Sequence, residues 1–179
     1  MSDIKKININ IDNKNENRKE KKSGTKKRII TDSKSWKKYE DKLSIENQYD
    51  YINQLHDNNI IDDEICNIIQ QQVKQKISGY RNQDTIKKIL DIDKLITKEK
   101  TIQLLYDSGL DCYYCKEKVV IMYDNVREPK QWSLDRIDND IGHNNDNVVI
   151  ACLSCNLQRK TMYHERFAFT KQLNIIKKE

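Results

Sequence analysis

The chain has 179 residues, which is enough for one domain and an extension. Charged residues make up 34% of it and the mean hydropathy is −0.92, so its hydrophobic core must be small. No apolar run approaches the roughly 20 residues of a membrane-spanning helix, and the N-terminus lacks the apolar core of a signal peptide. We therefore expect a soluble, intracellular protein with no membrane partner.

Positive charge is concentrated near the N-terminus. Residues 1–40 hold 13 Lys and Arg against 6 Asp and Glu, a net charge of +7, whereas residues 41–179 hold 20 against 22. Residues 1–34 have few large apolar residues and no regular period, which predicts a disordered basic leader. Such an arm suits contact with phosphates, or else serves only as a solubilising tail. Its segment 21–28, KKSGTKKR, resembles a nuclear-localisation cluster.

The segment 35–110 is predicted to be helical. Ser44, Asp62 and Thr97 each precede an apolar pattern of helical period and are good N-cap residues. The helix that follows Ser44 is expected to run to about His56. Gly79 is expected just after the end of the second helix, with a short helix over 84–90 beyond it.

Two further residues of this segment have predicted structural roles. Gly109 is expected to end the helix that follows Thr97. Cys66 falls on the second helix and is expected to be a small buried apolar residue.

The pattern changes at residue 111. Short apolar runs separated by Asp, Asn, Gly and Pro predict strands over 119–123, 132–137 and 147–151. Helical patterns return from residue 154, and a last one extends to about residue 176. The predicted fold class is α+β, with a helical N-terminal region followed by a metal-stapled domain over 111–179.

Four cysteines form two matched pairs. Cys112 and Cys115, and then Cys152 and Cys155, have C-x2-C spacing, with 36 residues between the pairs. Two such turns can direct four thiolates to one tetrahedral zinc ion, which would be structural because no position stays open. The alternatives are two disulfides, which need an oxidising compartment, or a redox motif in one pair.

The stretch from Trp132 to Lys160, WSLDRIDNDIGHNNDNVVIACLSCNLQRK, resembles the HNH endonuclease family, which has the ββα-metal fold. The resemblance covers about residues 111–165, in the order C-x2-C, L-D, a Gly-containing turn, D-N-V-V and C-x2-C-N. It implies two strands and a helix that hold a divalent ion beside the structural zinc. The sequence also resembles HNH proteins of large DNA viruses, whose place is the host cytoplasm or nucleus.

The family's functional positions can be carried over individually. Asp135 falls on the metal-binding aspartate, and Asn156 falls on the ligand that opens the helix. Their oxygens suit Mg²⁺ or Mn²⁺. Asn147 falls on the asparagine that braces the loop and the general base. Arg159 and Lys160, one turn along the helix, are expected to contact the phosphate backbone.

One position departs from the family. The residue after the metal-binding aspartate is usually the histidine that activates water, and here it is Arg136, which is a poor base. His143, in the turn between the strands, is the leading substitute, although it is as well explained as a polar turn residue. Asp138 is the next candidate as base or ligand, unless it forms an Asx turn. His164 and His56 rank lower.

These features predict a metal-dependent endonuclease that acts on DNA, with RNA as a further possible substrate. Arg136 would hold the scissile phosphate and stabilise its charge. Because Arg136 replaces the usual base, the alternative is a zinc-stapled nucleic-acid-binding module that no longer cuts. A third reading is a zinc-ribbon interaction domain without a nucleic-acid role. Nothing in the sequence indicates an oligomeric state.

Overall fold

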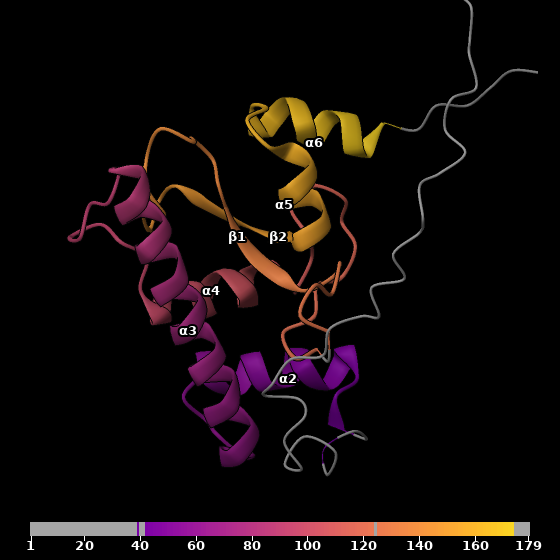
Figure 1. The fold of residues 1–179 in the computed structure, drawn as a ribbon. Helices are drawn as coiled ribbons and strands as arrows, with labels where there is room; N and C mark the ends of the chain where they lie inside the picture. The colour runs from indigo at the N-terminus through magenta and orange to yellow at the C-terminus, as the bar shows by residue number, and fades with distance from the viewer. Residues whose placement is uncertain (1–38, 40–41, 124, 174–179) are drawn as a thin grey trace, which may run out of the picture.

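The computed structural model describes residues 39, 42–123 and 125–173, and Figure 1 shows their arrangement. The basic leader predicted over 1–34, with its cluster over 21–28, lies outside the described residues. Within them the chain is a mixture of helices and a small sheet, as the α+β prediction requires. The elements in chain order are α2 (Ile45–His56), α3 (Asp63–Lys87), α4 (Lys98–Asp107), β1 (Trp132–Arg136), β2 (Val148–Cys152), α5 (Leu153–Arg159) and α6 (His164–Gln172).

The predicted N-caps are confirmed. The side chains of Ser44, Asp62 and Thr97 accept hydrogen bonds from the backbone N–H groups of Asn47, Ile65 and Lys100, respectively. Each cap satisfies a donor that has no partner inside its own helix. Helix α2 ends at His56, as expected, and Gly109 lies just beyond α4 in the left-handed region, with φ +57°.

Gly79 does not end the second helix, so that prediction was wrong. Helix α3 continues through Gly79 and ends at Lys87. Its C-cap, Lys88, adopts φ 60° and ψ 33°, and the Lys88 N–H donates to the carbonyls of Asp84 and Thr85. The short helix expected over 84–90 is therefore the last turn of α3. The helix tolerates an internal glycine because Tyr80, the next residue, and Asp84, just over one turn later, are buried and anchor its C-terminal half.

The sheet is a two-stranded antiparallel hairpin. Strand β1 pairs with β2 in a register that sets Trp132 opposite Cys152 and Arg136 opposite Val148. The third strand, expected over 119–123, is not formed, and only an isolated bridge joins Val120 to Gln131. Val120 bonds to the backbone of Lys130 and Trp132, whereas the next two N–H groups of the segment bond to a side chain.

That side chain is Gln48 on α2. Its Oε1 accepts the N–H groups of Ile121 and Met122 at 2.8 and 2.9 Å, and its Nε2 donates to the Leu43 carbonyl at 2.8 Å. Gln48 is only 2% exposed. One buried amide therefore satisfies two backbone N–H groups of the segment and attaches it to the helical region.

The helical region and the hairpin share one hydrophobic core. Fully buried residues come from both parts, among them Ile69 of α3, Leu105 of α4, and Trp132 and Leu134 of β1. In Figure 1, α5 and α6 follow the hairpin on the side away from α2. Among the described residues, no helix has both the length and the apolar character needed to cross a bilayer.

The Gln48 contact gives a test of this shared core. In Gln48→Ala the N–H groups of Ile121 and Met122 lose their acceptor, and a buried unsatisfied group costs roughly 1–3 kcal/mol. We expect chemical denaturation to show a clear loss of stability. The control Gln75→Ala, on the exposed face of α3, should change stability by less than about 0.5 kcal/mol. Equal stability of the two variants would contradict this account of Gln48.

Candidate active site and metal centre

The four paired cysteines come together in space. The sulfur atoms of Cys112, Cys115, Cys152 and Cys155 all lie within 4.8 Å of one another, and those of Cys115 and Cys152 are 4.0 Å apart. Tetrahedral zinc with Zn–S bonds of 2.3 Å would separate the sulfurs by about 3.8 Å. A disulfide needs about 2.05 Å, and all four thiols are free. The cluster could therefore hold a metal such as zinc.

Backbone groups already point at these sulfurs. Cys152 N–H donates to Cys112 Sγ at 3.3 Å, and Cys155 N–H donates to Cys152 Sγ at 3.4 Å. The pKa of Cys112 falls to about 4, chiefly because the Cys152 thiol donates a hydrogen bond to it. Such bonds stabilise a thiolate, the form that binds metals. Cys152 also caps α5, so the cluster sets where that helix begins.

Cys66 takes no part in the cluster. It lies in α3 with no exposed surface, and burial raises its pKa to about 11. It is a buried core residue, as its sequence context predicts.

A cleft of about 590 Å³ lies beside the hairpin. Asp135, Arg136, His143, Asn156 and Lys160 line it, so the structure brings together five of the eight residues predicted for the nuclease site. One face of α3 also lines this cleft, with Lys76, Gly79, Tyr80, Gln83 and Lys87. The helical region, whose role the sequence leaves open, therefore forms part of the same site.

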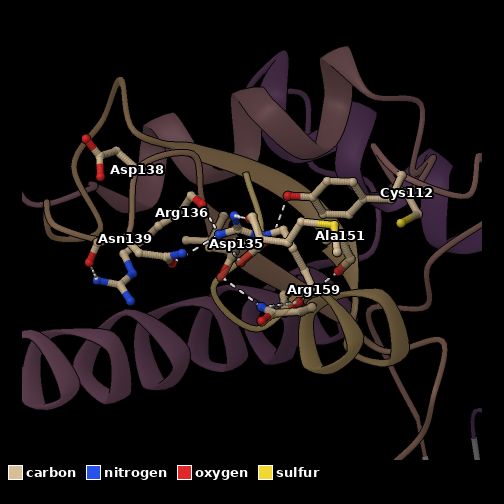
Figure 2. Close-up of polar contacts among 12 residues, drawn as sticks. Cys112, Asp135, Arg136, Asp138, Asn139, Ala151 and Arg159 are labelled. Carbon is tan, nitrogen blue, oxygen red and sulfur yellow. Dashed lines mark hydrogen bonds and ion pairs between the residues drawn. The ribbon is translucent and has the colours of Figure 1, made fainter. Parts of the chain in front are cut away.

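Asp135 makes a buried ion pair with Arg159. Arg159 Nε donates to Asp135 Oδ2 at 2.6 Å, and its Nη2 donates to Oδ1 at 3.2 Å (Figure 2). Tyr114 Oη also donates to Oδ2 at 2.6 Å, and burial raises the pKa of this tyrosine, which keeps its hydroxyl protonated. Both lone pairs of Oδ2 are thus used, while Oδ1 has one bond.

Arg159 does not lie where a phosphate backbone could reach it. Its side chain is 1% exposed and donates further bonds to the carbonyls of Arg136 and Met162 and to Asn139 Oδ1. The expectation that Arg159 contacts nucleic acid was therefore wrong. A buried carboxylate on β1 requires a buried cation, and the last residue of α5 supplies it.

Asn156 is held by its amide nitrogen. Nδ2 donates to Ser133 Oγ at 3.1 Å and to the Leu134 carbonyl at 3.3 Å. Its Oδ1 is left as a ligand atom on a residue that lines the cleft. Together, Oδ1 of Asn156 and Oδ1 of Asp135 fit the oxygen chemistry of Mg²⁺ or Mn²⁺, since ligating carboxylates are commonly held by further hydrogen bonds.

Asn147 fastens the loop between the strands. Its Oδ1 accepts the Asp138 N–H at 2.9 Å, and its Nδ2 donates to the carbonyls of Asp138 and Gly142 at 2.9 Å each. These contacts are the kind expected of a brace. Asp138 itself accepts the Asp140 N–H at 2.9 Å through Oδ1, which is an Asx turn, and its side chain is exposed.

Asp138 thus forms the Asx turn that the sequence offered as the alternative to a base or metal ligand. Asp138 is not among the residues that line the cleft, and in Figure 2 it lies apart from Asp135 and Arg159. Its side chain stabilises the turn instead.

Arg136 is nearly buried and bonded to the loop. Its Nη1 donates to the carbonyls of Asn139 and Ile141 at 2.8 and 3.1 Å. Because Nη1 makes these bonds, Nε and Nη2 are the donors that remain for a ligand in the cleft. Arg136 thus shapes the loop as well as carrying positive charge.

His143 is 4% exposed and bonded to Asp84 of α3. Burial lowers its pKa, and the charges of Arg136 and Lys87 lower it further, whereas Asp84 raises it. The ring is therefore neutral near pH 7. Since an ionised carboxylate only accepts, the contact with Asp84 favours a proton on Nδ1 and a lone pair on Nε2.

Sequence reasoning missed Asp84, Tyr80 and Tyr114. A signal for Asp84 was present, because it continues the buried stripe of α3 after Ile69, Val73 and Tyr80 at helical spacing. A carboxylate on a buried stripe requires a partner. Nothing in the sequence near Tyr114 pointed to Asp135.

Comparison with protein-family models, with curated proteins and with solved structures finds no match for this chain. The function must therefore be argued from the site itself.

The buried ion pair gives a second test. Arg159→Ala leaves the Asp135 carboxylate buried without a cation, which typically costs roughly 3–5 kcal/mol. The neighbouring Lys160→Ala removes the same charge from an exposed position and should change the free energy of unfolding by less than about 0.5 kcal/mol. Denaturant titration compares the two. Similar small effects would mean that Arg159 is not a structural partner of Asp135.

Proposed function

We propose that this protein is a metal-dependent, HNH-type endonuclease that hydrolyses phosphodiester bonds of DNA in the cleft between α3 and the hairpin. The observation that carries the proposal is that His143, whose ring contacts the Asp84 carboxylate, lines the same cleft as Arg136, Asp135 and Asn156. A base, a cation and oxygen ligands on one surface are the groups that phosphodiester hydrolysis needs.

Positive charge in the cleft supports a polyanionic substrate. Lys76 and Lys87 of α3 line the cleft together with Arg136 and Lys160. Lys87 and Lys160 are exposed, so they are the cations best placed to meet phosphates in solvent. The basic leader would add nonspecific contacts to phosphates of the same nucleic acid.

The proposed reaction breaks the bond between phosphorus and the 3′ oxygen. A water molecule gives a proton to Nε2 of His143 while its oxygen bonds to phosphorus. The 3′ oxygen leaves with the bonding electron pair and takes a proton from solvent. Arg136 stabilises the negative charge that develops on the phosphoryl oxygens.

Asp135 and Asn156 would hold the catalytic ion through one oxygen each. Arg159 and Tyr114 fix the orientation of the Asp135 carboxylate, and Ser133 fixes that of Asn156. When bound, Mg²⁺ or Mn²⁺ would supply positive charge to the leaving oxygen and the phosphoryl group.

The four-cysteine cluster would hold a separate, structural zinc ion. Four sulfurs complete a tetrahedral shell, so this ion has no open position for substrate. Its role would be to join the segment before β1 to the start of α5, where Asn156 lies.

Metal analysis tests the zinc assignment. The purified protein should contain about one zinc per chain, and Cys152→Ser should lose it and become less stable because one of four ligands is gone. Cys66→Ser is the matched control, since Cys66 is buried outside the cluster, and it should keep its zinc. Elemental analysis measures both. Full zinc content in Cys152→Ser would rule out this cluster as the site.

A specific observation favours a second candidate function. The ion pair between Asp135 and Arg159 places a guanidinium against the carboxylate that would bind the catalytic ion. A cation at that position weakens the affinity for a divalent ion. The second candidate is therefore a zinc-stapled module that binds nucleic acid without cutting it.

Plasmid nicking separates these candidates. The wild type should nick supercoiled DNA with Mg²⁺ or Mn²⁺, and His143→Ala should lose about 100-fold or more in rate because the general base is gone. His164→Ala is the matched control, because His164 lies on α6 and does not line the cleft. RNA substrates are assayed in parallel.

Each outcome has a distinct meaning. Cutting that requires His143 supports the nuclease. A salt-sensitive mobility shift without cutting supports the binding module. If the protein neither cuts nor shifts nucleic acid, the remaining reading is a zinc-dependent interaction domain. Cutting that is equally fast in His143→Ala would assign the base elsewhere.

A further inference from the structure

One buried carboxylate joins the helical region to the loop that carries the proposed base. Asp84 lies on α3 with no exposed surface. Its Oδ2 accepts the backbone N–H of His143 at 2.7 Å, and its Oδ1 lies 2.8 Å from Nδ1 of the same residue. The carboxylate therefore binds both the backbone and the ring of His143, and this fixes where the ring lies.

Two further contacts hold the same residue. The ring of Tyr80, one turn before Asp84 on α3, stacks on the His143 ring with centroids 4.4 Å apart and planes 23° apart. The His143 carbonyl accepts the Ile96 N–H at 2.8 Å. His143 is thus held on one ring face, at Nδ1 and at both backbone groups. A polar turn residue with no special role would not need such a setting.

Gly142 shows how closely the loop approaches Asp84. A Cβ at this position would lie 3.0 Å from Asp84 Oδ2 and 2.8 Å from the Ile89 carbonyl oxygen. Since real Cβ atoms do not approach backbone oxygens so closely, a side chain here would push the loop away from the end of α3. The glycine is what permits the contact between Asp84 and His143.

We propose that Asp84 is the positioning residue of a histidine–carboxylate pair: it keeps the proton of His143 on Nδ1 and so presents Nε2 to the cleft as the base. This inference rests on the proposed function of His143. Asp84 is not expected to touch the substrate, and it acts only through the ring. The helical region would then supply an essential part of the active site.

A purely structural role for Asp84 would be to anchor the loop. Asp84→Asn separates the two roles because it keeps the size of the side chain and one acceptor oxygen. Its NH₂ group must face either the His143 N–H or Nδ1. If the NH₂ group faces Nδ1, it donates a hydrogen bond to that atom. The ring proton then moves to Nε2, and Nε2 loses the lone pair that a base needs.

The test combines NMR and kinetics on the full chain. Nitrogen NMR of labelled histidine should show the proton of neutral His143 on Nδ1 in the wild type and a shift toward Nε2 in Asp84→Asn. Nicking by Asp84→Asn should slow about tenfold or more, within the range of general-base catalysis. The same change should have no effect when His143 is already alanine, because residues that act through one another are not additive. Asp50→Asn, exposed on α2, is the matched control.

The pH dependence of the nicking rate is a measurement that a loss of loop anchoring alone would not change. The charged groups around the ring are Asp84 and Lys87 of α3 and Arg136 of β1, and Tyr80 packs on its face. Asp84 is the one among them that raises the pKa of His143. Without its charge, the acid limb of the rate profile should move to lower pH.

The outcomes for Asp84 and for the nuclease are distinguishable. Suppose that the wild type cuts. If Asp84→Asn then cuts equally well, or if adding Asp84→Asn to His143→Ala lowers the rate further, Asp84 is not a positioning residue. If the wild type does not cut, the proposed function fails, and the NMR measurement alone decides whether Asp84 sets the tautomer. A wild-type ring with its proton on Nε2 would overturn the inference in either case.

Discussion

The ion pair between Asp135 and Arg159 is the contact on which the site depends. It joins the C-terminal end of β1 to the last turn of α5, and its guanidinium also bonds the carbonyls of Arg136 and Met162. Two buried charges are costly to desolvate, so they persist only when they are paired and hydrogen-bonded. The pair therefore requires the hairpin, the helix and the following turn to meet in a single arrangement.

The cysteine cluster and α3 hold the two sides of that arrangement. The cluster fixes the start of α5, while Gln48 and Asp84 attach the loops on either side of β1 to the helical region. Each attachment is a buried polar group with more than one partner, which makes it specific as well as stabilising. The cleft is the space between these attached parts, so the fold determines which residues line it.

The cap and cysteine signals in the sequence were reliable, whereas contacts between distant residues were not predicted. The caps at Ser44 and Asp62 and the C-x2-C pairs depend on neighbours a few residues away, and all were predicted. The role of Arg159 depends on a carboxylate 24 residues away, and that of Gln48 depends on backbone groups 73 and 74 residues away. The position of Arg159 one turn along the helix suggested a phosphate contact, whereas burial beside Asp135 decided its role.

The lack of a side chain at Gly142 limits how far the hairpin and α3 can be altered independently. Because the loop reaches Asp84 only through a residue without a side chain, the hairpin with its cysteines is fitted to one particular helix end. The hairpin is therefore expected to keep the position of His143 only beside this helix end. A different helix in place of α3 would leave the four cysteines together and separate His143 from its carboxylate.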